Sequence, residues 1–421
     1  WTFRTGGDRM RWTKYLIFLF YCLLLTGCGG GSRPGEKTVE FWQFWTDPQA
    51  KAIIEQAVAE FEKENQGVKV NITDLTWNDG HQKIVSAFAA GRPPDLLELG
   101  SDWIAEFAAE GVLLDLTAEL AKTQSQFVGW SPAIWEEKCY ALPWYLGTRV
   151  IFINCEHASA VGLDCHRPPI TWDNMIEWAE ALHNLGSQVG GFGANAPEKH
   201  RLYKKFLPFL WSNGGRILSE DGNFSVIDSE LAITALKYYV KLFEKSMVEK
   251  QAVLDELFVR GRLSMVISGD WLYKKLREAD EAPDFALAML PFPAPGQGGQ
   301  ISFAGGEYLT IPTKANNPIG ALGLARTLTN ERNSINLCIA TGGSTPANVT
   351  AMDNPYFTDN AERKVFIRQL QSSRATPPHP QWVYIEQIIE EAVEKAMYKR
   401  LTPEEALNEA ARKITKLLRE D

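Results

Sequence analysis

The chain is short of positive charge. Its 421 residues hold 43 Lys and Arg against 52 Asp and Glu, which gives a formal net charge of −9. Residues 1–27 contain four of the bases and one acid, so the remainder is more acidic still. Because a nucleic-acid partner requires a basic surface, this balance argues against one.

The common catalytic motifs are also missing. The sequence has no GxxxxGK[ST] phosphate loop, no HExxH zinc motif and no GxSxG nucleophile turn. Its six histidines show no metal-ligand spacing outside one cysteine-rich segment. These absences argue against enzymes of those classes, and we expect neither a metal nor a cofactor.

A short apolar run near the N-terminus predicts export. Residues 15–25 are apolar and uncharged and follow two bases, which is typical of a secretory signal that starts at Met10. The run is too short to span a membrane, which takes about 20 residues. Leu25-Thr26-Gly27-Cys28 resembles the bacterial lipobox, in which cleavage precedes a cysteine that then carries lipid; the alternative is an ordinary cleavage site with an incidental cysteine.

We therefore expect a signal peptide over 1–27, lipidation of Cys28 and a Gly/Ser/Pro-rich flexible tether over 28–37. The protein is then extracytoplasmic and lipid-anchored to a membrane. Export also permits disulfides.

Two cysteines ten residues apart, Cys155 and Cys165, lie in a turn-rich stretch and predict a local disulfide. The alternative is a metal cluster that adds His157 and His166, although this spacing matches no common zinc pattern.

The first hundred residues alternate between two periodicities. Strand patterns at 39–45, 68–73 and 95–99 flank helix patterns at 48–65 and 79–90, with Pro near the start of the first helix and Gly after each. This alternation predicts an α/β fold with a parallel sheet covered by helices.

The rest of the chain continues with longer spacings, and its length predicts more than one domain. We expect an extended segment at 141–154 and a loop or crossing at 291–300. Strands are expected at 263–267, 285–290 and 308–311, and helices at 172–184, 204–213, 229–245, 252–260, 318–330 and from 383 onward.

Six motifs follow the lipobox-like segment in order. They are VEFWQFW (39–45), GRPPDL (91–96), ALPWY with FIN (141–145, 152–154), MVISGDW (265–271), GGEYL (305–309) and GSTP (343–346). Their order and spacing resemble the extracellular solute-binding proteins of bacterial ABC importers, in the branch that takes up maltose, trehalose and other oligosaccharides. The resemblance covers essentially everything from residue 38 to the end.

The resemblance implies the class II periplasmic-binding-protein fold: two α/β lobes, each a mainly parallel sheet flanked by helices, with the ligand in the cleft between them. Three chain crossings, near 146–152, 295–305 and 341–347, would join an N-terminal lobe (38–147 plus 305–342) to a C-terminal lobe (148–304 plus 343–421). It also implies a monomer without catalysis that closes on a carbohydrate and delivers it to permease subunits with a cytoplasmic ATPase.

A sugar needs aromatic faces for its C–H surfaces and polar partners for its hydroxyls. Trp45 and Asp47 follow the first strand, at the edge where ligands gather in α/β sheets. Tyr145 lies beside the first crossing, and Gly306 permits close backbone approach. The expected ligand-binding residues are Trp45, Asp47, Asp102, Tyr145, Trp211, Asp270, Trp271, Gly306, Glu307 and Arg374.

Several of these residues have structural alternatives. Asp47 and Asp102 are each placed to cap a helix. Trp45, Trp211 and Trp271 are each apolar enough to belong to a core. Relatives often carry an aromatic residue where Glu307 stands, which leaves its role open.

Two other functions fit parts of the sequence. The same fold binding a polyol or a phosphate ester such as glycerol phosphate would call for clustered Arg or Lys, whereas Arg149, Arg326 and Arg374 are scattered. An extracytoplasmic glycoside hydrolase would need two carboxylates about 5–9.5 Å apart, which Asp102, Asp270 and Glu307 supply by count alone.

The substitution Cys28→Ser tests the anchor. It removes the only side chain of the lipobox-like segment that can carry the lipid, so the variant should leave the membrane fraction and remain folded. Cell fractionation of wild type and variant measures this. A variant that stays with the membrane as firmly as the wild type contradicts lipidation.

Overall fold

The computed structural model describes residues 37–186, 189–278, 287–290, 292–295, 299–342 and 345–420. The predicted signal peptide, Cys28 and the tether up to residue 36 lie outside these ranges. Within them, no helix combines the length and the apolar character needed to cross a lipid bilayer.

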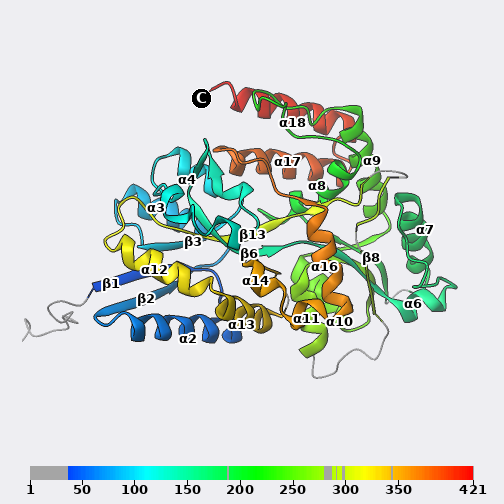
Figure 1. Ribbon diagram of the computed structural model, residues 1–421. Helices are drawn as coiled ribbons and strands as arrows, with labels where there is room; N and C mark the ends of the chain where they lie inside the picture. The colour runs from blue at the N-terminus through cyan, green and yellow to red at the C-terminus, as the bar shows by residue number, and fades with distance from the viewer. Residues whose placement is uncertain are drawn as a thin grey trace, which may run out of the picture.

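The strands form two main sheets (Figure 1). The six-stranded sheet has the order β14-β6-β13-β3-β1-β2. Strand β1 pairs in parallel with both β3 and the edge strand β2, whereas β13 runs antiparallel to both β3 and β6. The strands are β1 (Lys37–Gln43), β2 (Val68–Asp74), β3 (Leu96–Gly100), β6 (Ala141–Gly147), β13 (Gly305–Thr310) and β14 (Thr345–Pro346).

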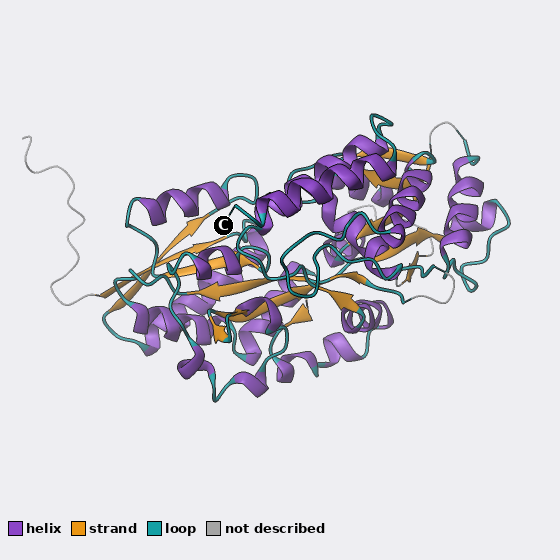
Figure 2. Cartoon of the chain, turned by 90° about the horizontal axis from the view of Figure 1, so that it is seen from above, coloured by secondary structure: helices purple, strands orange, loops and turns teal. Residues whose placement is uncertain are grey.

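The five-stranded sheet has the order β11-β7-β10-β8-β9. Here β8 pairs in parallel with β10 and β9, while β7 is antiparallel to β10 and β11. The strands are β7 (Val150–Asn154), β8 (Gly190–Asn195), β9 (Ser246–Glu249), β10 (Leu263–Ser268) and β11 (Leu287–Leu290). Seen from above, the strands fall into two groups along the length of the molecule, with helices around both (Figure 2).

Helices that cover the six-stranded sheet come from both the start and the middle of the chain. They are α2 (Pro48–Glu64), α3 (Gly80–Ala89), α4 (Ile104–Ala109), α12 (Pro318–Leu328) and α13 (Glu331–Thr341). Helix α2 shows why the local sequence folds this way. Asp47 accepts the backbone N–H groups of Gln49 and Ala50, Pro48 occupies the first turn, and the buried side chains recur at helical spacing.

The helices around the five-stranded sheet are α6 (Cys155–Ala160), α7 (Trp172–His183), α8 (Leu202–Ser212), α9 (Glu230–Phe243), α10 (Gln251–Val259), α11 (Asp270–Glu278), α16 (Ala361–Gln371), α17 (Trp382–Met397) and α18 (Pro403–Leu417). Short elements complete the chain: α5 (Thr117–Leu120), α14 (Val349–Met352), α15 (Pro355–Thr358), the 3₁₀ turns at Gln124–Gln126 and Ser131–Ala133, and the two-stranded pairs β4 (Ile134–Trp135) with β5 (Lys138–Cys139) and β12 (Ser302–Phe303) with β15 (Ser373–Arg374).

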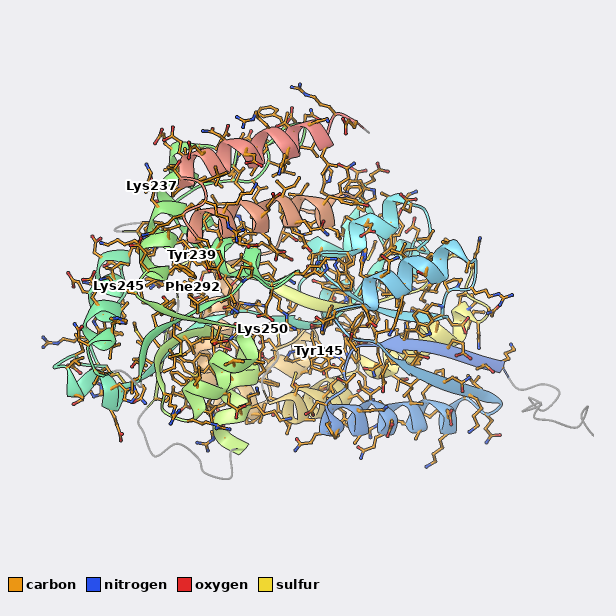
Figure 3. The ribbon with its side chains drawn as sticks, turned by 180° about the vertical axis from the view of Figure 1, so that it is seen from behind. Tyr145, Lys237, Tyr239, Lys245, Lys250 and Phe292 are labelled. Carbon is orange, nitrogen blue, oxygen red and sulfur yellow. A yellow bond between two sulfur atoms is a disulfide. The ribbon has the colours of Figure 1, made fainter. Side chains whose placement is uncertain are left out.

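Each sheet has its own hydrophobic core. Much of the heavy tryptophan content serves these cores, because Trp103, Trp144, Trp172, Trp178, Trp211 and Trp382 are all buried. Tyr239 and Phe292 belong to the core beneath α8 and α9 (Figure 3).

The chain passes between the sheets next to β12 and β15. The predicted extended segment at 141–154 is two strands, since β6 belongs to one sheet and β7 to the other. Thr148, between them, donates from its hydroxyl to the carbonyl of Phe303 (3.0 Å), and Phe303 pairs in register with Arg374. The lobe division stays a prediction, and we place its third crossing after residue 346, because β14 pairs with β6.

The local bridge expected from the cysteine spacing is present, since Cys155 and Cys165 form a disulfide. Cys139 and Cys338 are free thiols. The metal cluster that would have used Cys155 and Cys165 is therefore wrong.

Candidate ligand-binding site

A cavity of about 440 Å³ lies between the two sheets and is lined from both sides. Trp45, Asp102 and Glu307 reach it from the six-stranded sheet, and Asp270 and Trp271 reach it from the start of α11. Each of these residues, apart from Glu307, directly follows a strand or begins the helix after one. The cavity therefore sits at the edge where strand ends from both sheets meet.

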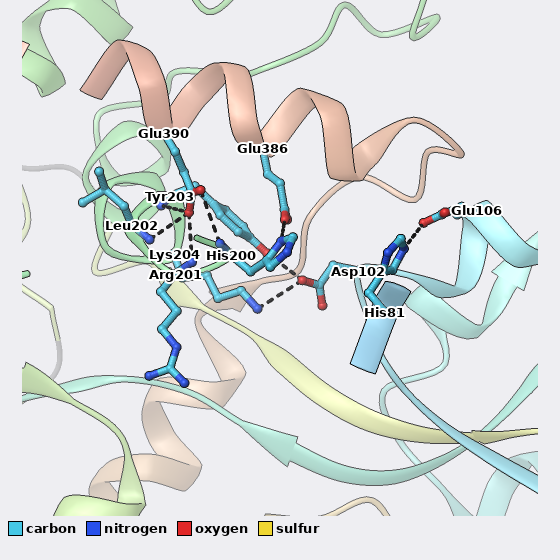
Figure 4. Close-up of polar contacts among 10 residues, drawn as sticks. All are labelled: His81, Asp102, Glu106, His200, Arg201, Leu202, Tyr203, Lys204, Glu386 and Glu390. Atoms are coloured by element: carbon cyan, nitrogen blue, oxygen red, sulfur yellow. Dashed lines mark hydrogen bonds and ion pairs between the residues drawn. The ribbon is translucent and has the colours of Figure 1, made fainter. Parts of the chain in front are cut away.

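Asp102 joins the two sides of the cavity (Figure 4). Its carboxylate accepts the Tyr203 hydroxyl (2.6 Å) and lies 3.1 Å from the Lys204 ammonium, and both partners belong to α8. Burial alone would raise the pKa of Asp102, but the Lys204 charge and the Tyr203 hydrogen bond hold it below its usual range. Asp102 is thus ionised and already satisfied by protein groups.

The start of α8 is held in place by α17, the helix before α18. The Glu390 carboxylate accepts the backbone N–H groups of Arg201 and Leu202 (2.9 Å each), and Glu386 contacts the His200 ring nitrogen (Figure 4). Both N–H groups also bond to the Glu198 carbonyl (3.1 and 3.2 Å), so Glu390 is their second acceptor at a helix start, where N–H groups lack partners within the helix. Burial raises the pKa of Glu390 to about 7.

Two further carboxyl groups line the cavity without an ion pair among the described residues. Burial raises the pKa of Asp270 to about 6, and burial together with the nearby Asp270 charge raises the pKa of Glu307 to about 7. Glu98, fully buried behind them on β3, has its pKa raised by burial and by Glu307. Like charges in a low-dielectric space therefore favour proton retention near neutral pH.

A hydrogen-bonded network fixes the plane of Trp271. Its indole N–H donates to Asp255 (2.9 Å), which also accepts from the Ser268 hydroxyl (2.8 Å) and the Gln251 amide (2.7 Å). Asp255 is 1% exposed, so its charge depends on these donors. The network presents Trp271 as a rigid wall of the cavity.

Six of the ten predicted ligand-binding residues line this cavity. They are Trp45, Asp102, Asp270, Trp271, Gly306 and Glu307. Their part in binding stays a prediction. Gly306 has a structural reason of its own, because a Cβ there would collide with the carbonyl oxygen of Tyr145.

Four predicted residues do not line the cavity. Asp47 is exposed and caps α2, while Arg374 is exposed on β15. Tyr145 is fully buried near the middle of the molecule (Figure 3) and packs edge-on against Trp45 with ring centroids 5.4 Å apart. Trp211 is also buried and stacks on Phe303. Tyr145 therefore lies behind the cavity residue Trp45, and Trp211 lies behind the cavity residue Phe303.

Sequence reasoning missed Arg149, Lys204, Asp255 and Phe303, which all line the cavity. Lys204 lies in α8 and Asp255 in α10. The spacing of apolar and polar residues along a helix does not by itself reveal that one face lines a cavity. Phe303 lies two positions before the start of the GGEYL motif at Gly305, and this proximity to the motif was the available signal.

The comparisons with known proteins agree with this geometry. Residues 45–334 match the family model of the bacterial extracellular solute-binding proteins. The galactooligosaccharide-binding protein of Bacillus subtilis is 26% identical over 388 residues, which is 87% of each chain. Two solved structures share the fold: a solute-binding protein of Thermotoga lettingae bound with α-D-tagatose (TM-score 0.81, 24% identity, 91% and 100% coverage) and maltose-bound MalE3 of T. maritima (TM-score 0.79, 23% identity, 90% and 99% coverage).

The raised pKa of Glu307 predicts how the substitution Glu307→Gln changes stability with pH. Between pH 5 and 8 the unfolded carboxyl, with a pKa near 4.3, is largely ionised, while the folded one at about 7 loses its proton late. The folded state thus loses stability as pH rises, and E307Q escapes this loss. We expect the variant to gain about 2 kcal/mol on the wild type from pH 5 to 8.

Chemical denaturation at the two pH values measures this gain. Glu404, exposed on α18, supplies the control E404Q, whose difference from the wild type should be the same at both pH values. Parallel curves for E307Q and the wild type would show that Glu307 ionises normally.

Proposed function

The chain belongs to the bacterial extracellular solute-binding proteins, and we propose that it is the carbohydrate-binding subunit of an ABC importer. Membership of this family makes the protein extracytoplasmic. Its family and its structural neighbours are binding proteins, and we propose that this chain likewise binds its ligand without transforming it.

One observation carries the proposal: the cavity combines rigid aromatic walls with carboxylates and cations at its edges. Trp45, Trp271 and Phe303 offer apolar faces, and Asp270, Glu307 and Arg149 offer acceptors and donors. Apolar ring faces and a rim of hydroxyls are the two surfaces of a sugar, and each finds a partner here. The galactooligosaccharide-binding relative supports a di- or oligosaccharide as the ligand.

Closure of two lobes on the ligand is the mechanism we propose for signalling. The cavity draws its walls from both sheets, so a ligand inside touches both and has more contacts when they approach. This difference in contacts shifts the population toward the closed arrangement. The closed form would then dock on permease subunits that work with a cytoplasmic ATPase, with the protein acting as a lipid-anchored monomer through Cys28.

The two alternative functions find less support. The carboxyl groups of Asp270 and Glu307 line the same cavity as the cations and would repel a phosphate ester. Lys204, one of these cations, is already paired with Asp102. For a hydrolase, Tyr203 and Lys204 already hold the Asp102 carboxylate, which leaves Asp270 and Glu307 as the two carboxyl groups able to act, and a turnover assay tests them.

A ligand screen tests the function. Thermal unfolding of the purified protein against mono-, di- and trisaccharides, polyols and glycerol phosphate should show stabilisation by a sugar, because a ligand at 100 times its Kd adds about 2.7 kcal/mol. Small-angle scattering with the binding sugar should show a smaller radius of gyration. If glycerol phosphate alone stabilises the protein, the ligand is a phosphate ester and not a sugar. If a sugar binds but the radius of gyration is unchanged, closure of the lobes is excluded.

Trp271→Ala should weaken sugar binding and leave the fold intact. The expected loss is ~1–3 kcal/mol, by analogy with the removal of one aromatic side chain on which a nucleic-acid base stacks. Calorimetry measures the affinity and chemical denaturation the stability. Trp211, buried behind Phe303 and off the cavity, supplies the matched variant W211A, which should lose stability by ~3–5 kcal/mol. Normal affinity with a lowered midpoint for W271A would make Trp271 a core residue.

A further inference from the structure

Arg149 stands where the chain first passes between the two sheets, two residues after β6 and one before β7. Its backbone is fixed there, because its carbonyl accepts the Ser302 hydroxyl (2.7 Å) and the preceding Thr148 donates to the Phe303 carbonyl. The side chain therefore starts from a well-defined point in the wall of the cavity.

Two aromatic rings hold the guanidinium group of Arg149. Its Cζ atom lies 5.5 Å from the centroid of Trp271 and 5.0 Å from that of Phe303. Trp271 is fixed by Asp255, and Phe303 is backed by Trp211. Stacking on rings stabilises the planar cation but uses none of its N–H donors, which point outward in the plane of the group.

The donors of Arg149 have no partner among the described residues. Its Nε is buried and unpaired, and no hydrogen bond or ion pair of its guanidinium is found there. The neighbouring cations differ, since Lys204 is paired with Asp102 and Lys205 donates to the Ile267 carbonyl (3.0 Å). Buried donors without a partner are rare in proteins because each costs free energy.

We propose that Arg149 is a specificity-determining residue that donates to two neighbouring hydroxyl oxygens of an uncharged sugar ring, while Asp270 and Glu307 accept the protons of such hydroxyls. This inference rests on the proposed carbohydrate function and deepens it by naming the ligand group. An arginine has five N–H donors in a fixed fork, which fits two adjacent oxygen atoms.

The neighbouring carboxyl groups decide between hydroxyls and a carboxylate on the ligand. Asp270, Glu307 and Asp102 all interact electrostatically with the Arg149 charge. A pair of hydroxyls both accepts from Arg149 and donates to these acids. A ligand carboxylate only accepts, and at pH 8, where Asp270 and Glu307 are ionised, these acids repel it, so the cavity then favours a neutral sugar over its uronic-acid counterpart.

The test uses the sugar that binds best in the ligand screen, and calorimetry on the wild type, R149K and R149M. Loss of charged hydrogen bonds should weaken binding by about 10- to 100-fold in R149M. R149K should also bind weakly, because an ammonium does not reproduce the fork. The matched control is R363K, since Arg363 stacks over Tyr356 (3.7 Å) but donates to the Gly342 carbonyl and lies off the cavity; its affinity should not change.

Ligand analogues give a readout that a structural role would not move. Analogues of the sugar that lack one hydroxyl should bind the wild type more weakly than the sugar does. For the analogue that lacks the hydroxyl bound by Arg149, the substitution R149M should weaken binding less than it does for the complete sugar, because that hydrogen bond is already absent. Denaturation should show R149M to be as stable as the wild type or more so, since an unpaired charge is removed.

The outcomes separate this inference from the proposed function. If no carbohydrate stabilises the wild type, the carbohydrate function fails and this inference fails with it. If a sugar binds the wild type and R149M equally, or if its uronic-acid counterpart binds more tightly at pH 8, only the role given to Arg149 is overturned.

Discussion

The molecule depends on a small set of hydrogen bonds where three stretches of chain meet between the sheets. Thr148 donates to the Phe303 carbonyl and shares a hydrogen bond with the Ser373 hydroxyl, and Ser302 donates to the Arg149 carbonyl. Each of these bonds joins two residues that are more than 150 positions apart in the sequence. Because the cavity draws its lining from both sheets, this junction helps to set the relative position of the groups that face it.

Charge in the cavity is arranged by the same geometry. Four acids and several bases line the cavity, and an unpaired charge on a buried one of these groups is costly. The protein satisfies Asp102 and Asp255 with its own side-chain donors, whereas among the described residues the Arg149 guanidinium has no hydrogen bond or ion pair, and neither Asp270 nor Glu307 has an ion pair. This division is the basis on which we propose Asp270, Glu307 and Arg149 as the groups that contact the ligand.

Local patterns predicted the first sheet well. The helix expected at 48–65 is α2 (Pro48–Glu64), and that expected at 79–90 is α3 (Gly80–Ala89), because Pro, Gly and apolar spacing act over a few residues. Helix α13 was missed, since its sequence ERNSINLCIAT shows little apolar periodicity. In the site, strand-end residues such as Trp45 and Asp270 were found by position. The pairing of Asp102 with Tyr203 spans 101 positions and follows from no local pattern.

The contact between Glu390 and the start of α8 has a consequence for how the site is made. Tyr203 and Lys204 lie at the start of α8, where the Glu390 carboxylate of α17 accepts the N–H groups of Arg201 and Leu202, which also bond to the Glu198 carbonyl. A chain that emerges from its N-terminus lacks this partner until almost its whole length has appeared. The cavity wall that carries Tyr203 and Lys204 therefore lacks this support until α17 has emerged.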